Sequence, residues 1–130
     1  LTDFVLGDHL EKVLRPTAQP NLFVIPSGPL PPNTSEILGS LGMEVAIKHL
    51  VAAADLVIFD MPPLMAVADA AVLAGKVDAV LYLVPIGKES RRFAAKGLEL
   101  LRLVKAPVIG MVCTFIKRHE FEGYAYHYHV

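Results

Sequence analysis

The chain has 130 residues, of which 54% are hydrophobic and 19% are charged, and its formal net charge is −1. This length fits one domain, and the high apolar fraction with a net charge near zero argues against an intrinsically disordered chain. The 12 Lys and Arg are balanced by 13 Asp and Glu, which argues against nucleic-acid binding through a basic face. A single cysteine, Cys113, allows neither an internal disulfide nor a zinc cluster and fits a reducing, cytosolic setting.

The most apolar stretch, residues 51–73, does not have the pattern of a membrane span. Acidic residues and prolines interrupt it before it reaches the roughly 20 apolar residues that a spanning helix needs. No basic segment followed by an apolar segment marks a signal peptide at the start. We therefore expect a soluble chain. It begins at Leu1 rather than at a methionine, which suggests a processed product or a fragment.

The first part of the chain predicts short helices and one strand. A turn of helix is expected over residues 4–6, and the capping-box pair Asp8 and Glu11 predicts a second short helix that ends before Pro16. The apolar run 21–25 lies between prolines and predicts a buried strand.

A proline-rich loop over residues 27–32 leads into two further helical segments, one that starts at Asn33 and one that Ser40 caps. The second segment has apolar residues at helical spacing, which we expect to face inward: Met43, Ala46, Ile47 and Leu50.

The remaining sequence alternates apolar runs with helical segments. Buried strands are predicted over residues 56–60, 79–84 and 108–112, and helices over residues 67–73 and 93–104. Strands without polar alternation, separated by helices, are typical of a parallel sheet covered on both faces. The fold class is therefore α/β.

Asp60 is the first candidate for a functional role. It ends the predicted strand 56–60, at the sheet edge where α/β proteins bind ligands. In nucleotide hydrolases such an acid holds Mg²⁺ or its water beside the phosphates, whereas the simpler alternative is a solvated carboxylate. Neither Gly-Lys pair, at 75–76 and 87–88, is followed by the Ser or Thr of a phosphate-binding loop.

Residues 117–130 have no core-building pattern and are interpreted as a flexible, tyrosine-rich tail after a domain of residues 1–116. Three tyrosines alternate along it, Tyr124, Tyr126 and Tyr128. A tail can offer each phenol to an active site, and phosphorylation adds about −1.5 to −2 charges per site. One alternative is a tail without a role. Another is transition-metal binding by its imidazoles, His119, His127 and His129.

The other polar residues have simpler interpretations. Cys113 ends an apolar strand and is predicted to be a buried small hydrophobic residue rather than a nucleophile. Four residues follow strand ends on the ligand side, where they either approach a nucleotide or a neighbouring subunit or form a solvated helix surface: Asp69, Lys88, Arg91 and Arg92.

Several stretches resemble the bacterial protein-tyrosine autokinases of capsule and exopolysaccharide export, which belong to the P-loop superfamily. The main ones are LTDFVLG (1–7), NLFVIPSGPLPPNTSEIL (21–38) and DLVIFDMPPL (55–64), followed by AVADA (66–70) and VDAVL (77–81). The resemblance covers nearly the whole chain and extends into the tail. The strand that ends in Asp60 would by itself equally suit septum-site or chromosome-partition ATPases of the same superfamily.

The resemblance implies a kinase domain that uses ATP and Mg²⁺ and transfers the γ-phosphoryl group to tail tyrosines of a neighbouring subunit in a ring. Asp60 matches the Walker B acid that serves Mg²⁺. Thr114 stands where the family usually has an asparagine near the adenine, and Met61 where it has a small polar residue. The acceptor cluster is matched by Tyr124, Tyr126 and Tyr128.

The partners implied are the neighbouring kinase subunits, a membrane polysaccharide co-polymerase, fused or separate, and a cognate tyrosine phosphatase, with no nucleic acid. The implied location is the cytoplasmic face of the plasma membrane. The family's Walker A loop and a second acidic motif precede the position that matches Leu1. We therefore expect a partial P-loop sheet without its first strand, unpaired strand edges, marginal stability and no ATP hydrolysis by this chain alone. Two alternatives remain open, a catalytically inactive binding or substrate module derived from a kinase, and a fragment of a partition-type ATPase.

Overall fold

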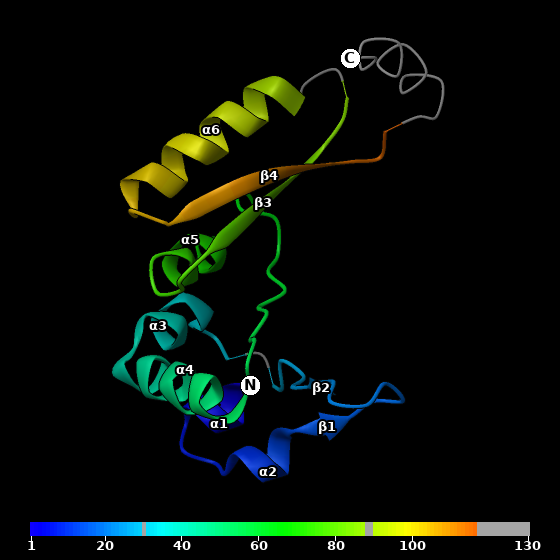
Figure 1. The fold of residues 1–130 in the computed structure, drawn as a ribbon. Helices are drawn as coiled ribbons and strands as arrows, with labels where there is room; N and C mark the ends of the chain where they lie inside the picture. The colour runs from blue at the N-terminus through cyan, green and yellow to red at the C-terminus, as the bar shows by residue number, and fades with distance from the viewer. Residues whose placement is uncertain (30, 88–89, 117–130) are drawn as a thin grey trace. The chain divides into compact units, whose positions relative to one another are not determined.

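The computed structural model describes residues 1–29, 31–87 and 90–116. The chain divides into two compact units, Leu1–Leu73 and Ala74–Val130. Figure 1 shows a helical first unit and a second unit built on two strands. In the described ranges no helix is long and apolar enough to cross a membrane.

The first unit contains most of the helices that the sequence predicts. Its elements, of which the last ends one residue into the second unit, are α1 (Thr2–Val5), α2 (Leu10–Val13), β1 (Arg15–Pro16), β2 (Phe23–Val24), α3 (Thr34–Gly39), α4 (Leu41–Ala53) and α5 (Asp69–Ala74). The predicted capping box of α2 is wrong, because His9 is the N-cap residue and Asp8 instead forms an ion pair with Lys12, with Oδ1 and Nζ 3.3 Å apart.

Helix α4 carries the core of the first unit. The predicted inward residues Met43, Ala46 and Leu50 are buried, which confirms the helical spacing read from the sequence, whereas Ile47 is half-buried. Helix α1 contributes two more buried side chains, Phe4 and Val5, and packs against α4.

The predicted cap at Ser40 is confirmed and gives a testable stability effect. Its Oγ accepts a hydrogen bond from the Met43 N–H at 3.2 Å and donates one to the Ile37 carbonyl at 2.7 Å. We expect Ser40→Ala to lower the free energy of unfolding by about 1 kcal/mol, because the helix loses the acceptor of an otherwise unpaired N–H. Urea unfolding checks this, and Ser40→Asn, which keeps an acceptor and a donor, should retain most of the stability. Equal losses in both variants would contradict a capping role.

The predicted buried strand 21–25 is wrong in its burial and in its length. Only β2 forms, and it pairs antiparallel with β1, so that Arg15 faces Val24 and Pro16 faces Phe23. Phe23 and Val24 are 53% and 50% exposed. An apolar run is buried only when other elements cover it, and among the described strands β2 has no partner except β1.

The predicted strand 56–60 is also not formed. This segment has no regular secondary structure, and Leu56 and Ile58 are 74% and 80% exposed. Within the described ranges no strand pairs with it. A strand needs a neighbour to satisfy its backbone N–H and C=O groups, so an apolar, β-prone sequence alone does not produce one.

The second unit confirms the α/β alternation. It contains β3 (Val80–Pro85), α6 (Ser90–Leu103) and β4 (Val108–Thr114), and the two strands pair in parallel, as a strand, helix and strand in sequence should (Figure 1). One face of this pair packs against α6, where Val84 and Leu101 are buried.

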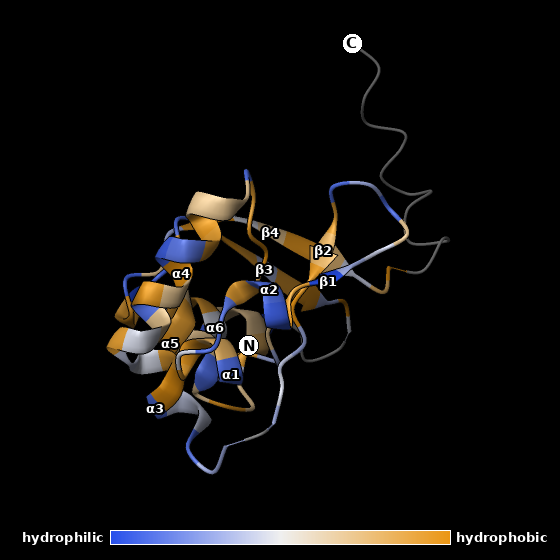
Figure 2. Ribbon diagram, turned by 90° about the horizontal axis from the view of Figure 1, so that it is seen from below, coloured by the Kyte–Doolittle hydropathy of each residue, from blue (hydrophilic) through white to orange (hydrophobic). Residues whose placement is uncertain are grey.

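No described element of the second unit covers the other face of the β3–β4 pair, so the expectation of a sheet covered on both faces is wrong for the described part of this unit. Leu81 and Leu83 are 58% and 59% exposed, and Val112, which pairs with Leu83, is 42% exposed. Both strands consist mainly of hydrophobic residues (Figure 2). Parallel strands are normally buried on both faces, so the uncovered apolar surface expected from the sequence is present.

Tyr82 on β3 packs closely against α6 at Gly97. A Cβ atom at Gly97 would lie 2.0 Å from the Tyr82 Oη and 2.6 Å from its Cζ. The ring therefore occupies space that only a glycine at this helix position leaves open.

Burial raises the pKa of the Tyr82 phenol above its ordinary value of 10.0, because desolvation disfavours the charged phenolate. A pKa that is higher in the folded than in the unfolded state leaves stability unchanged below pH 10 and lowers it as the pH rises above that value. We expect urea unfolding to show this decline as the pH rises above 10, and Tyr82→Phe to reduce it. Identical pH dependences for the two proteins would contradict the expectation.

Candidate functional site

Asp60 lies in the first unit, in the irregular segment between α4 and α5. Its carboxylate is exposed to solvent. The two prolines that follow it lead into a turn closed by a 2.9 Å hydrogen bond from the Ala66 N–H to the Pro63 carbonyl. The prediction that Asp60 ends a strand is therefore wrong, because residues 56–60 form no strand. Its carboxylate is nevertheless accessible to a ligand.

The residues around Asp60 fit a magnesium site only in part. Mg²⁺ in nucleotide sites takes one or two protein carboxylates and completes its shell with phosphate oxygens and water. Across residues 1–29, 31–87 and 90–116 there is no group of three His, Cys, Asp or Glu that could hold a metal ion. Asp60 can thus serve as a single protein ligand, and the nucleotide and water would have to supply the others.

Asp69 has a structural partner that the sequence analysis missed. The Ser35 hydroxyl in the first turn of α3 donates a hydrogen bond to the Asp69 carboxylate at the start of α5. This contact joins two helices whose first turns are 34 residues apart. The structure therefore gives Asp69 a role in packing rather than a purely solvated one.

Thr114 lies in the second unit, at the carboxyl end of β4 and opposite Pro85 of β3. Its carbonyl accepts a hydrogen bond from the Ile86 N–H at 2.9 Å, and the residue is half-buried. Thr114 thus stands at the end of a parallel strand pair where α/β proteins place ligand-binding residues. The prediction that Cys113 is buried is wrong, because β4 is incompletely covered and the thiol is exposed.

The remaining candidate residues are either exposed to solvent or lie outside the residues that the structure describes. Arg91 and Arg92 are exposed on α6, as the simpler interpretation predicts. The proposed phospho-acceptors and some other candidates lie outside the described residues: Tyr124, Tyr126, Tyr128, His119, His127, His129 and Lys88.

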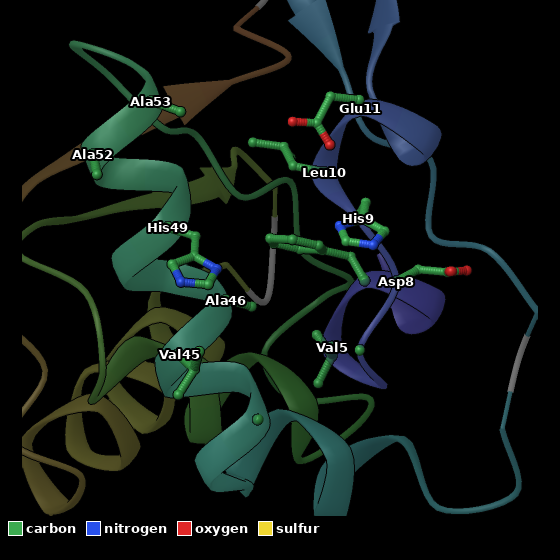
Figure 3. Close-up of a pocket in the computed structure, with 13 residues that line it drawn as sticks. Val5, Asp8, His9, Leu10, Glu11, Val45, Ala46, His49, Ala52 and Ala53 are labelled. Carbon is green, nitrogen blue, oxygen red and sulfur yellow. The ribbon is translucent and has the colours of Figure 1, made fainter.

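A half-open cavity of about 610 Å³ in the first unit was not predicted from the sequence. It lies between α4 on one side and α1, α2 and the turn that joins them on the other, and we call it the α1–α4 cavity (Figure 3). None of the predicted site residues that the structure describes lines it.

Comparison with known proteins gives a consistent result, although no family model matches the chain. The tyrosine-protein kinase YwqD of Bacillus subtilis is 35% identical over 118 residues, which cover 91% of this chain and 50% of YwqD. The tyrosine-protein kinase CpsD of Streptococcus pneumoniae serotype 4 is 33% identical over 113 residues, which cover 86% of this chain and 50% of CpsD.

Solved structures agree. The kinase domain of Escherichia coli tyrosine kinase ETK has a TM-score of 0.77 at 28% identity and covers 89% of this chain and 48% of that domain. The VpsO kinase domain, with a TM-score of 0.82 over 90% of this chain and 58% of that domain, is 21% identical and supports the fold alone. The resemblance read from the sequence is therefore confirmed, and the chain is a relative of the bacterial tyrosine-protein kinases that spans about half the length of YwqD and CpsD.

Proposed function

We propose that this chain is part of an ATP-dependent bacterial tyrosine autokinase that regulates the chain length and export of a capsular or extracellular polysaccharide. The observation that carries the proposal is its 35% identity with a tyrosine-protein kinase across 91% of the chain. ATP and Mg²⁺ are the cofactors of this activity. The catalytic portion is residues 1–116, and residues 117–130, here called the tail, are the acceptor.

Phosphoryl transfer depends mainly on positioning and on neutralising charge, and a bound Mg²⁺ would supply the charge neutralisation. Asp60 is the residue of this chain that would hold the ion or its water, because its carboxylate is exposed and follows an apolar run. Thr114, at the carboxyl end of β4, would lie near the base.

The tail supplies the acceptor hydroxyls in this proposal, in trans to a neighbouring copy in a ring. Each phosphate adds about −1.5 to −2 charges, so phosphorylated tails repel one another and weaken the ring. The proposed partners are a membrane polysaccharide co-polymerase, which holds the kinase at the cytoplasmic face of the membrane, and a tyrosine phosphatase that resets the tail.

A second candidate is a catalytically inactive module whose tail is phosphorylated by another kinase. It is favoured by two departures from the family pattern beside the predicted nucleotide site, Met61 and Thr114. The two candidates predict different results for a hybrid protein, in which the part of YwqD outside the matched region is joined to residues 1–130 of this chain. Autophosphorylation of this hybrid supports the kinase, whereas phosphorylation of the chain only by an added intact kinase supports the module.

The tail tyrosines should accept nearly all of the phosphate in either assay. We expect the combined change of Tyr124, Tyr126 and Tyr128 to phenylalanine to abolish phosphotyrosine, because phenylalanine lacks the accepting hydroxyl. Phosphotyrosine immunoblotting and mass spectrometry measure this, with Tyr82→Phe as the matched control because Tyr82 packs against α6. Undiminished phosphate in the triple variant would place the acceptor elsewhere.

A further inference from the structure

Asp60 lies in a segment of the first unit whose path is not set by regular structure of its own. This segment, residues 54–68 and here called the Asp60 segment, joins the end of α4 to the start of α5 and forms neither a helix nor a strand. None of its residues is buried, and Leu56 and Ile58 are exposed in it. A segment with few buried contacts is held only weakly by itself. The position of the Asp60 carboxylate therefore depends on how the two ends of the segment are held.

Helix α4 holds the first end of the Asp60 segment. Its side chains Met43, Ala46 and Leu50 are buried, so the helix is fixed in the core of the first unit. The Ser40 hydroxyl joins this helix to α3, because it donates to the Ile37 carbonyl at 2.7 Å while it accepts from the Met43 N–H at 3.2 Å. Helices α3 and α4 therefore form one connected pair, to which the second end of the segment can be attached.

The second end of the Asp60 segment is held where α5 meets α3. The Ser35 hydroxyl donates a hydrogen bond to the Asp69 carboxylate, which joins the first turns of the two helices. Farther along, a Cβ atom on Gly39 would lie 3.7 Å from the Val72 Cγ1. Helices α3 and α5 therefore lie side by side (Figure 1). The Ser35–Asp69 bond is half-buried and its acceptor is charged, which makes it stronger than an exposed bond between neutral groups.

We propose that the Ser35–Asp69 hydrogen bond holds the Asp60 segment in the arrangement in which Asp60 binds Mg²⁺, so that Ser35 and Asp69 are positioning residues. The inference rests on the proposed function, in which Asp60 holds the ion or its water. Without the bond, α5 and the second end of the segment leave α3 in a fraction of the molecules. The apparent affinity for the ion falls in proportion to the fraction that stays docked, whereas at a saturating ion concentration nearly all molecules are docked again.

Hydrogen exchange of the α5 amides in the full 130-residue chain, followed by NMR, tests whether the bond holds this helix. Ser35→Ala removes the donor and should speed exchange of the Val72 N–H, which bonds to the Ala68 carbonyl at 3.0 Å, by about fivefold or more. Exchange in α4 should stay unchanged, because the core around Met43 and Leu50 is not altered. A general loss of stability would instead speed exchange in both helices.

Metal binding by the YwqD hybrid tests whether the bond acts on Asp60. Mn²⁺ replaces Mg²⁺ as the probe, and its binding in the presence of ADP is followed by EPR, which requires no phosphoryl transfer. We expect Ser35→Ala to weaken Mn²⁺ binding by about fivefold. The Mg²⁺ concentration for half-maximal autophosphorylation should rise by the same factor, whereas the rate at saturating Mg²⁺ should fall less than about twofold. A merely structural role would lower the rate at every Mg²⁺ concentration and leave this requirement unchanged.

Three further variants identify the bond as the cause. Ser35→Thr keeps the hydroxyl and should restore both α5 exchange and Mn²⁺ binding. Asp69→Ala should behave like Ser35→Ala, and the two together should lose no more than either alone, because they remove the same interaction. Thr34→Ala is the matched control, since Thr34 is the neighbouring residue on α3 and is half-buried like Ser35. Its hydroxyl has no hydrogen-bond partner in the part of the chain that the structure describes.

Four results would overturn the proposal: unchanged α5 exchange in Ser35→Ala, unchanged Mn²⁺ binding in Ser35→Ala, equal changes in Ser35→Ala and Thr34→Ala, or no Mn²⁺ binding by the hybrid without substitutions. Autophosphorylation is measured separately. A hybrid that autophosphorylates but keeps its Mn²⁺ affinity with Ser35→Ala refutes the positioning role alone. A hybrid that never autophosphorylates but loses Mn²⁺ affinity with Ser35→Ala refutes the proposed kinase function and leaves the positioning role standing.

Discussion

Replacing Asp60 with asparagine should lower the autophosphorylation rate of the hybrid kinase by about 100-fold or more. Asparagine has nearly the same shape, but it removes the negative charge with which a carboxylate binds Mg²⁺. The loss follows from weaker charge neutralisation at the phosphates, which is the main contribution of the ion to phosphoryl transfer. Initial rates of phosphotyrosine formation at a fixed ATP concentration measure it.

Asp55→Asn is the control for this substitution, because Asp55 is an exposed acid in the same irregular segment. Its rate should stay close to that of the unchanged hybrid. Asp60→Asn should also need a higher Mg²⁺ concentration for half-maximal rate, which a general loss of folding would not produce. A full rate at ordinary Mg²⁺ would show that Asp60 does not hold the ion.

Gly97→Ala should destabilise the second unit by about 1–3 kcal/mol, because the added methyl group overlaps the Tyr82 ring. Helix propensity alone predicts the opposite sign, since alanine in a helix interior is favoured over glycine by about 1 kcal/mol. The Cβ position 2.0 Å from Oη and 2.6 Å from Cζ decides the sign, because the ring has to leave its place against α6. Urea unfolding of the full chain, with hydrogen exchange of the α6 amides, measures the effect.

A substitution at Tyr82 tests whether its ring causes the destabilisation by Gly97→Ala. Tyr82→Ala in combination with Gly97→Ala should remove most of the added cost, whereas Tyr82→Phe should relieve it little because Cζ remains. Gly87→Ala is the matched glycine control, since a Cβ there meets no atom within 4 Å. A stabilising Gly97→Ala would show that Tyr82 does not occupy this position.

The helices were largely predictable from the sequence because their determinants are local. Ser40 caps α4 through the N–H three residues later, and Met43, Ala46 and Leu50 lie on the buried side that their spacing predicts. The α6 segment and the two flanking strands of the second unit were also found at nearly their predicted positions. Each of these signals lies within a few residues of the element it specifies.

Strand burial could not be read from the sequence in the same way. The runs 21–25 and 79–84 are similarly apolar, yet only the second forms a long strand, because β4 supplies a parallel partner. The run 56–60 has no such partner among the described strands and stays irregular. An apolar, β-branched composition sets the tendency to form a strand, whereas hydrogen bonds to another segment decide whether it forms.

For the candidate site, too, local features were predictable from the sequence and contacts between distant segments were not. The sequence by itself determined the α/β class, the family resemblance and the choice of Asp60 and the tail tyrosines, because these depend on residue types and short spacings. The tertiary structure alone decided the contact of Ser35 with Asp69, the packing of Tyr82 on Gly97 and the α1–α4 cavity. These features join residues from about 15 to more than 40 positions apart, and burial, ring packing and cavity shape depend on which segments meet in space.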